Sequence, residues 1–318
     1  MKYIVTGAAG FIGSSLVDFL LSKGHTVYGV DNFSTGKKQF LKKALGSKNF
    51  KLLKIDLLDN LIDDKFFRDI DQVYHMAANA DIRDGLNHPK KDLEQNLIVT
   101  FNILEQMRKN NVKKIVFASS AAALGEPSFF PTDEKLPIPH QTSLYGASKL
   151  ASEALISAYC EGYGFSASIY RFVSILGPRY PHGHVFDFVK KLLKDPNKLE
   201  ILGDGTQKKS YLHINDCIEA IIKISNKVFK SQDCQVFHLG TEEYIKVSDS
   251  ASLISKLMNL NPDFEFTGGR NGWIGDNPFV FLDISKAKSY GWQPKKTINE
   301  SLQDTVDFLL KNKWIYDD

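Results

Sequence analysis

Short apolar segments rich in β-branched residues alternate with longer amphipathic segments along the first half of the chain. The short segments, each a predicted strand, cover residues 3–6, 26–31, 50–55, 72–75, 114–118 and 166–171. Two of the longer segments, 14–22 and 92–108, are predicted helices. Strands that alternate with helices in this way are typical of a parallel sheet with crossover helices. We therefore predict an α/β fold with a doubly wound parallel sheet.

The alternation ends near residues 177–183, Gly-Pro-Arg-Tyr-Pro-His-Gly, after which the predicted elements are short and mixed. This change predicts a smaller mixed α/β lobe that closes over the carboxyl ends of the strands, where ligands bind in such folds. We expect the first domain to cover residues 1–173. The second lobe is expected to cover residues 174–318, with some of this later chain crossing back to the first domain.

Composition excludes several classes of function. The chain has 318 residues, 43% apolar and 24% charged, with a net charge of +3 and scattered basic residues, which disfavours nucleic-acid binding. Its three cysteines lack the spacing of a metal or redox site. The chain starts directly on a predicted strand, and no apolar run reaches the length of a membrane span. We expect a cytoplasmic protein without a metal and without nucleic-acid or membrane partners.

A glycine-rich loop at residues 6–13, Thr-Gly-Ala-Ala-Gly-Phe-Ile-Gly, joins the first predicted strand to the first helix. Backbone N–H groups at such a helix start hold a pyrophosphate, and glycine permits its close approach. Asp31 ends the next strand, where a carboxylate receives the ribose hydroxyls of NAD and repels the ribose phosphate of NADP. The alternative, a glycine turn of an unrelated α/β protein, is disfavoured by the combination of strand, helix and acid. We predict a Rossmann domain that binds NAD through Gly7, Gly10, Phe11, Ile12, Gly13, Asp31 and Asn32.

Tyr145 and Lys149 are four residues apart on a predicted helix, so their side chains lie on one face, one turn apart. An ammonium ion beside a phenol favours the phenolate, and a phenol of ordinary pKa about 10 then becomes a base near neutrality. Ser120 lies upstream, after Ser119, near the end of a predicted strand. The alternatives are an aromatic residue packed between the lobes and a solvated lysine. The joint spacing favours catalysis by Ser120, Tyr145 and Lys149.

Together these motifs resemble the extended short-chain dehydrogenase/reductase family, which includes NAD-dependent nucleotide-sugar epimerases and dehydratases. The resemblance covers essentially the whole chain and rests on residues 6–13, 31–36, 56–57, 75–78, 96, 117–120, 145–149, 171–179, 203–205 and 282–287. It implies NAD as the cofactor. It also adds to the expected cofactor-binding residues Asp56, Leu57, Ala77, Ala78, Asn96, Tyr145 and Lys149.

The residues after Ser120 separate the subclasses of this family. Sugar 4,6-dehydratases carry an Asp-Glu pair there for the elimination of water, whereas this chain has Ala121 and Ala122. Alanine exchanges no proton, so that mechanism is disfavoured. The segment Asp-Asn-Phe-Ser-Thr-Gly at 31–36 and the small residues after Ser120 most resemble the UDP-glucose 4-epimerase group.

The resemblance implies a cycle of oxidation and return on a UDP-sugar. Tyr145, as the phenolate, takes the proton of the sugar 4-hydroxyl while hydride passes to NAD, and Ser120 shares the hydrogen bond to the reacting oxygen. Lys149 and the cationic nicotinamide lower the pKa of the phenol. Return of the hydride to the other face of the 4-keto sugar inverts the stereocentre. The expected activity is the interconversion of UDP-glucose and UDP-galactose.

The second lobe departs from the family pattern at positions expected to bind substrate. Ser174 stands where an asparagine usually contacts the diphosphate, and Lys209 where an arginine grips it. Trp273 replaces a second arginine, so either Arg270 reaches the phosphate or Trp273 stacks on the base. The alternatives for Lys209 and Arg270 are solvated surface cations.

Val280 aligns with the position that limits bulk at the sugar 2-position in epimerases. Valine is smaller than the tyrosine that excludes N-acetyl groups, so acceptance of UDP-GlcNAc and UDP-GalNAc is expected; the alternative is an ordinary core valine. Other functions on the same scaffold are a uronic-acid 4-epimerase, a UDP-glucuronate decarboxylase and a keto-sugar reductase. Arg83, His182 and His184 are candidate partners for the uronic carboxylate. A non-catalytic NAD or nucleotide-sugar binding protein is less consistent with retention of the tyrosine and lysine.

Apolar residues recur at helical spacing after Tyr145, at positions 144, 147, 150, 151, 154, 155 and 158. With the helix at 92–108 they imply, by the resemblance, the four-helix interface of a homodimer.

An internal hydride cycle benefits from a cofactor that never leaves the protein. We therefore predict that the purified protein carries tightly bound NAD, measurable by absorbance and mass spectrometry of the nucleotide released on denaturation. A protein that emerges without nucleotide and stays inactive with added NAD would argue against the cycle.

Overall fold

Seven parallel strands form the central sheet of the larger lobe in the computed structural model, which describes residues 1–59, 62–137, 140–273 and 275–316. The strand order is β11-β6-β5-β4-β1-β2-β3, and every neighbouring pair is parallel. The strands are β1 Lys2–Thr6, β2 Thr26–Asp31, β3 Phe50–Lys54, β4 Gln72–His75, β5 Lys114–Ser120, β6 Ser166–Phe172 and β11 Cys234–Leu239. The predicted doubly wound α/β fold is confirmed.

Six of these strands match the six predicted ranges, and the seventh, β11, was not predicted. Gln235 and His238 interrupt the apolar pattern of this strand, and only its last three residues are buried. Because β11 follows residue 173, the chain returns from the second lobe to complete the sheet beside β6.

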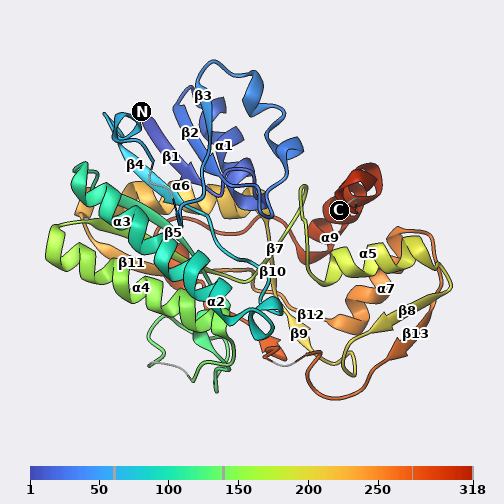
Figure 1. Ribbon diagram of the computed structural model, residues 1–318. Helices are drawn as coiled ribbons and strands as arrows, with labels where there is room; N and C mark the ends of the chain where they lie inside the picture. The colour runs from blue at the N-terminus through green and yellow to red at the C-terminus, as the bar shows by residue number, and fades with distance from the viewer. Residues whose placement is uncertain (60–61, 138–139, 274, 317–318) are drawn as a thin grey trace.

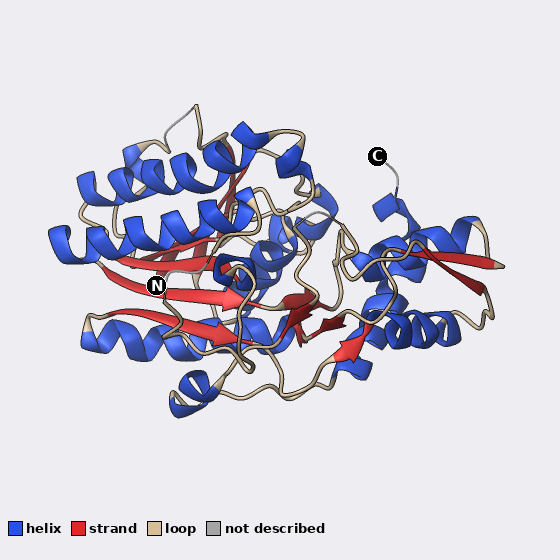
Figure 2. Ribbon diagram, turned by 90° about the horizontal axis from the view of Figure 1, so that it is seen from below, coloured by secondary structure: helices blue, strands red, loops and turns tan. Residues whose placement is uncertain are grey.

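Helices cover both faces of the sheet (Figures 1 and 2). The helices α1 Phe11–Ser22 and α6 Ile214–Ser231 contact each other on one face, and α3 Val99–Lys109 and α4 Leu144–Tyr163 on the other. Successive strand residues point to opposite faces, so Ile4 joins the core under α3 and α4 while Val5 joins the core under α1 and α6.

The single helix expected at 92–108 is three consecutive helical pieces. They are α2 Pro89–Asp92, a π-helical turn η5 Leu93–Ile98 and α3. The apolar pattern of the sequence did not reveal the π turn. Such turns are often found at functional sites.

The second lobe holds short strands and three longer helices (Figure 1). Its strands are β7 Ser174–Leu176, β8 Lys198–Ile201, β9 Lys208–Lys209, β10 Tyr211–His213, β12 Ile245–Lys246, β13 Asp263–Phe266 and β14 Phe279–Val280. Its helices are α5 His184–Lys194, α7 Val247–Leu257 and α9 Ile298–Lys311, whereas α8 Ser285–Ser289 packs against β11 of the central sheet. A third core lies between α5, α7 and α9.

Single 3₁₀ turns occupy parts of the connecting segments. They are η1 Lys38–Leu41, η2 Ala44–Gly46, η3 Asp64–Phe66, η4 Asp84–Leu86, η6 Ala121–Leu124 and η7 Lys313–Tyr316. In the part of the chain that the structure describes, no helix combines the length and apolar character needed to cross a membrane.

Candidate active site

The loop between β1 and α1 is folded so tightly that no side chain fits at Gly7 or Gly13. Gly7 has φ +64°, and a Cβ there would lie 2.7 Å from the backbone nitrogen of Ala77. A Cβ on Gly13 would lie 2.0 Å from the carbonyl oxygen of Gly7. Helix α1 begins after Gly10, which makes no side-chain cap, so its first backbone N–H groups are presented to an anion. This cradle fits the pyrophosphate of a dinucleotide.

The acid predicted to bind ribose lies beside this loop. Asp31 ends β2, and its Oδ2 accepts a hydrogen bond from the Ala9 backbone nitrogen at 2.8 Å. Its Oδ1 accepts one from the Phe33 nitrogen at 2.8 Å. Burial raises the pKa of Asp31, and these two hydrogen bonds oppose that effect. The carboxylate is thus held against the start of the cradle, as recognition of an adenosine ribose requires.

Asn32 and Asp56, which are also predicted to bind the cofactor, are hydrogen-bonded to each other. Asn32 Nδ2 donates to Asp56 Oδ2 at 2.9 Å, and Asp56 Oδ1 accepts from the Leu58 nitrogen at 2.9 Å. Leu57 between them is buried. The structure therefore gathers Asp31, Asn32, Asp56 and Leu57 beyond the carboxyl ends of β2 and β3, where an adenine ring would lie.

The segment after β4 passes directly beside the glycine loop. Ala77 donates its backbone N–H to Thr6 Oγ1 at 3.2 Å, and Ala78 follows it. Asn96 is fully engaged within the protein, because its Oδ1 accepts from the Asn79 nitrogen at 2.9 Å and its Nδ2 donates to Ser148 Oγ at 2.9 Å. Its contact with a cofactor would therefore be indirect, through the position of the Asn79 segment.

The three predicted catalytic residues converge where β5 meets α4. Ser120 is the last residue of β5, and Tyr145 lies in the first turn of α4, which Ser143 caps by accepting from the Gly146 nitrogen. Lys149 Nζ lies 5.8 Å from the centre of the Tyr145 ring. Tyr145 and Lys149 are only 8% and 2% exposed, which argues against a solvated lysine.

The preference for Ser120 over its neighbour agrees with the geometry. Ser119 Oγ donates to Glu153 Oε1 within the buried side of α4, away from the phenol. Ser120 instead acts on Tyr145, where its side chain favours a lower pKa of the phenol against the larger effect of burial. Ser120 Oγ also accepts from the Ala122 nitrogen at 3.1 Å, which fixes the hydroxyl at the strand end.

Burial has the largest effect on the pKa values of both Tyr145 and Lys149. It raises the pKa of Tyr145 to about 12; Ser120 opposes this rise and the charge of Asp92 adds to it. Burial lowers the pKa of Lys149 to about 7, while Glu153 and Asp92 raise it. The chain by itself therefore holds the phenol protonated at neutral pH. The lowering expected from the sequence requires a further positive charge, such as that of the nicotinamide.

Sequence analysis assigned no role to three buried charged residues beside this pair. Asp92 and Glu153 are 1% and 5% exposed, and Arg171 Nη2 donates to Glu153 Oε2 at 2.6 Å. Asp92 precedes Asn96 by four residues and Glu153 follows Lys149 by four. Each acid is therefore separated from a predicted site residue by four positions, the same spacing that links Tyr145 to Lys149 and that could have pointed to the acids in the sequence.

In the second lobe, two predicted substrate residues, Lys209 and Trp273, contact Asp276, and a third, Val280, lies beside Lys209. Lys209 Nζ donates to Asp276 Oδ1 at 2.7 Å and to the carbonyl oxygen of Asn277. The Asp276 nitrogen donates to the carbonyl oxygen of half-buried Trp273 at 3.1 Å. Val280 pairs with Lys209 across β14 and β9. The charge of Lys209 is thus already balanced by a buried carboxylate.

The other two predicted substrate residues lie apart from this group. Ser174 is exposed at the start of β7. Arg270 is 76% exposed at its side chain and pairs with Glu126 at 3.0 Å, as a solvated arginine would. No contact joins either residue to Asp276 among the hydrogen bonds of the described chain.

The three candidate partners for a uronic carboxylate have different surroundings. His184 is committed within the second lobe, because Nδ1 lies 2.9 Å from the Tyr211 hydroxyl and Nε2 3.0 Å from Ser250 Oγ. Arg83 Nη1 donates to Asp187 Oδ2 at 3.3 Å and so bridges the two lobes. His182 is exposed, and the charged residues around it are Asp81, Arg83 and Asp187.

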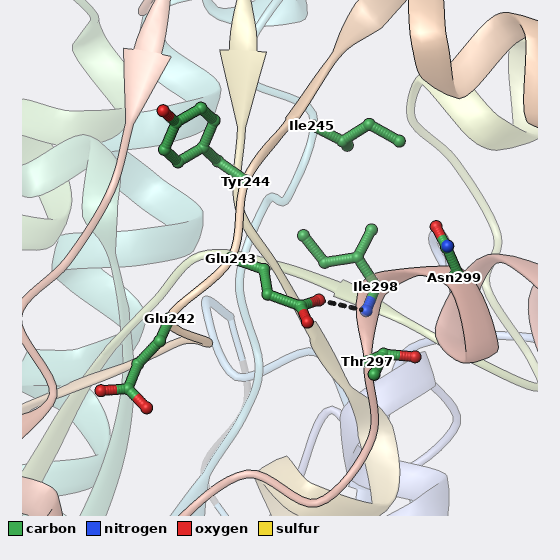
Figure 3. Close-up of a pocket in the computed structure, with 7 residues that line it drawn as sticks. All are labelled: Glu242, Glu243, Tyr244, Ile245, Thr297, Ile298 and Asn299. Atoms are coloured by element: carbon green, nitrogen blue, oxygen red, sulfur yellow. Dashed lines mark hydrogen bonds between the residues drawn. The ribbon is translucent and has the colours of Figure 1, made fainter.

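The surface pocket in Figure 3 is separate from all of these residues. Its walls come from the segment after β11 and the start of α9, and consist of Glu242, Glu243, Tyr244, Ile245, Thr297, Ile298 and Asn299. Glu243 Oε2 accepts from the Ile298 nitrogen at 2.9 Å, so this carboxylate caps α9. None of the predicted site residues lines the pocket.

Comparison with known proteins gives consistent matches over the whole chain. Residues 3–240 match the NAD dependent epimerase/dehydratase family. A putative UDP-glucose 4-epimerase of Methanocaldococcus jannaschii is 32% identical over 315 residues, which cover 97% of this chain and 98% of that protein. A UDP-glucuronate 4-epimerase of Thermodesulfobacterium geofontis is 32% identical over 320 residues, 98% of this chain and 96% of the relative.

Solved structures of this kind superpose closely. A crystal structure of UDP-galactose 4-epimerase has a TM-score of 0.86 and 33% identity, covering 99% of this chain and all of the other. UDP-glucuronic acid 4-epimerase from Bacillus cereus, in complex with UDP-glucuronic acid and NAD, has a TM-score of 0.89 and 28% identity. That match covers 98% of this chain and 99% of the other.

Replacing Gly13 by alanine tests the dinucleotide cradle. The new Cβ would meet the Gly7 carbonyl oxygen at 2.0 Å, so the loop must open and its N–H groups must move. We expect affinity for NADH to fall roughly tenfold or more, equivalent to about 1.4 kcal/mol. Fluorescence titration of nucleotide-stripped protein measures this. Gly162→Ala is the matched control, because a Cβ there meets no atom within 4 Å. Equal affinities would contradict the assignment.

Proposed function

The chain belongs to the NAD dependent epimerase/dehydratase family, and we propose that it is a UDP-sugar 4-epimerase that works through a transient 4-keto sugar. The family, the fold and NAD as the cofactor are confirmed by the match to the family and by NAD-containing structural neighbours. The observation that carries the finer proposal is the convergence of Ser120, Tyr145 and Lys149 at the end of β5, beside the dinucleotide cradle.

In the proposed reaction the chain moves one proton and holds one sugar oxygen. NAD, when bound, supplies a hydride acceptor and a positive charge beside the phenol. Tyr145 removes the proton of the 4-hydroxyl and later returns it. Ser120 donates a hydrogen bond to the same oxygen, and Lys149 keeps a cationic partner at the base. The cofactor itself would be held by Gly7, Gly10, Phe11, Ile12, Gly13, Asp31, Asn32, Asp56, Leu57, Ala77, Ala78, Tyr145 and Lys149, with Asn96 behind them.

The immediate surroundings of Ser120 favour epimerisation over dehydration. Ala121 and Ala122 form the first turn of η6, directly beyond the strand end. Neither can act as the acid or base that elimination of water from the sugar requires. A 4-keto sugar formed at this position would therefore be reduced again, from either face.

The proposed substrates are UDP-glucose and UDP-galactose, with UDP-GlcNAc and UDP-GalNAc accepted through the small side chain of Val280. Lys209 and Trp273 contact Asp276, and Val280 lies beside Lys209; this cluster is the proposed binding region for the nucleotide and diphosphate. Ser174 and Arg270 lie apart from the cluster and are proposed only as outer contacts.

A uronic-acid 4-epimerase is the second candidate. It is favoured by Arg83, which bridges to Asp187 between the lobes, and by the T. geofontis UDP-glucuronate 4-epimerase, whose 32% identity equals that of the M. jannaschii relative. A carboxylate at the sugar 5-position would then compete with Asp187 for the arginine.

We also propose that the protein is a homodimer through η5, α3 and α4. Four large apolar side chains on these elements are exposed: Leu93 at 48%, Ile98 at 38%, Phe101 at 44% and Leu144 at 43%. Figure 1 shows α3 and α4 next to each other on one side of the sheet. Exposed apolar side chains on two adjacent helices are typical of a subunit interface.

Proton NMR of the anomeric signals tests the activity. The protein is incubated in turn with UDP-glucose, UDP-galactose, UDP-GlcNAc and UDP-glucuronate, without added cofactor. We expect the C4 epimer to appear with the first three. Tyr145→Phe should lower the rate by about 10²–10⁴-fold, because it removes the proton-transfer group but keeps the ring.

The other outcomes decide between the candidates. Turnover of UDP-glucuronate alone would support the uronic-acid epimerase, and loss of carbon dioxide would indicate a decarboxylase. No change with any of the four sugars would refute the proposal. The same holds for a Tyr145→Phe protein that keeps the full rate.

Replacing Phe101 by aspartate tests the dimer. A charge in the middle of an apolar interface leaves an unpaired, desolvated carboxylate, so we expect the dimer to dissociate at micromolar concentration. Light scattering after size-exclusion chromatography gives the mass. Phe129→Asp is the matched control, since Phe129 is 42% exposed in a different segment. A wild-type protein of monomeric mass would rule out this interface.

A further inference from the structure

The helix that begins the dinucleotide cradle is anchored in the core of the second lobe. Phe11, the first residue of α1, packs against the third core, which lies between α5, α7 and α9. Its ring lies 6.0 Å from that of Tyr180 in an edge-on contact, and Tyr180 is a member of this core and only 6% exposed. The helix start that would hold the pyrophosphate is therefore fixed against the second lobe.

The segment that follows the ribose-binding acid is anchored in the same core. After Asp31, Lys37 donates its backbone N–H to the carbonyl oxygen of Ala9 at 3.0 Å, which ties this segment to the glycine loop. Phe40 in η1 is 3% exposed and belongs to the third core. Its ring lies 5.8 Å from that of Trp314 in η7, near the end of the chain. The ribose segment is therefore also held by the second lobe.

An ion pair makes a third connection, further along α1. Arg179 Nη2 donates to Asp18 Oδ2 at 2.5 Å, and the two side chains are 21% and 16% exposed. Within the described chain, Arg179 Nη1 and Asp18 Oδ1 are buried and have no hydrogen-bond partner. Each charge is therefore compensated by the other while the lobes are in contact, and removal of one charge leaves the other poorly compensated.

The backbone at Arg179 is also in an unusual conformation. Its φ of +78° lies in the left-handed region, which residues with a side chain rarely adopt. Such residues persist where surrounding contacts hold them, often at ligand clamps. Gly177, two residues earlier, donates its N–H to Thr305 Oγ1 of α9 at 2.8 Å, and Tyr180 follows Arg179 directly. The turn is thus held between α9 of the second lobe and α1 of the cradle.

We propose that Arg179 and Trp314 are positioning residues for NAD, which hold the pyrophosphate and ribose segments against the second lobe so that these contacts must break before NAD is released. We call the three contacts, Phe11 with Tyr180, Phe40 with Trp314 and Asp18 with Arg179, the interlobe contacts. Opening of such contacts then limits the rate at which the cofactor leaves. The inference goes beyond the proposed sugar chemistry and depends only on NAD as the cofactor.

The rate of NADH release tests this role. NADH is bound to nucleotide-stripped protein, excess NAD is mixed in by stopped flow, and the change in NADH fluorescence gives the dissociation rate constant. Asp18→Asn keeps the shape of the side chain but leaves the Arg179 guanidinium without a counter-charge while the lobes are in contact; water can hydrate it once they separate. We expect release to become roughly tenfold faster or more. Trp314→Ala should act in the same direction, because Phe40 loses its aromatic neighbour.

Two matched controls change the second lobe away from the interlobe contacts. Glu200→Gln removes a carboxylate from an ion pair of 2.6 Å with Lys191, and Phe264→Ala removes a ring that packs against the same third core. We expect release from both controls to stay within about twofold of the wild-type rate. An unchanged rate in either Asp18→Asn or Trp314→Ala would overturn the proposal, and so would equally fast release from the controls.

Hydrogen exchange of the wild-type chain replaces these variants if they do not fold. Binding of NADH should protect the backbone amides of α1, η1 and η7 together, as measured by mass spectrometry, while those of β13 stay unchanged. Protection of α1 and η1 without η7 would overturn the proposal. Neither measurement involves a sugar. A chain that is inactive on all four UDP-sugars but releases NADH faster in Asp18→Asn and Trp314→Ala would refute the proposed function and support the role of the interlobe contacts.

Discussion

The burial of Lys149 constrains the elements that surround the active site. Its Nζ donates to the carbonyl oxygen of Ala118 at 2.9 Å and lies 4.9 Å from the centre of the Phe117 ring, so water is largely excluded. An ammonium ion in such a place requires nearby carboxylates. Glu153 comes from the next turn of α4 and Asp92 from α2. The positions of β5, α4 and α2 are therefore linked through a single charge.

The need to balance buried charges extends across the sheet to β6 and β11. Glu153 is itself buried, and Arg171 on β6 balances it. Arg171 Nη1 lies 3.5 Å from Nε2 of His238, which burial and the charge of Arg171 keep neutral by lowering its pKa to about 3. His238 belongs to β11, so the returning strand completes a polar layer that begins at Lys149. Its polar residues are structural members of this layer, although in the sequence they made β11 look unlike a buried strand.

Sequence spacing predicted the parts of the site whose geometry is local. Glycines in a strand-to-helix loop, an acid at the next strand end and an i, i+4 tyrosine and lysine are each set by one or two elements. The sheet around them followed from apolar runs that match six of its seven strands. The π-helical turn and the burial of Asp92 were not predictable in this way, because they depend on which side chains meet between α2, the loop after β4 and α4.

In the second lobe, too, the sequence does not reveal the contacts that decide what a residue can do. Alignment with the family placed Lys209 where a cation grips the diphosphate, but the folded chain sets it against Asp276, which is only 9% exposed. A cation paired with a buried carboxylate contributes little net attraction to a distant anion, since the two charges form a dipole. A diphosphate bound there would gain affinity from hydrogen bonds donated by the Lys209 ammonium group, and the charge of Lys209 would add little. The sequence identified Lys209 as a candidate cation. How strongly that cation attracts a phosphate depends on Asp276, which lies 67 residues away in the chain.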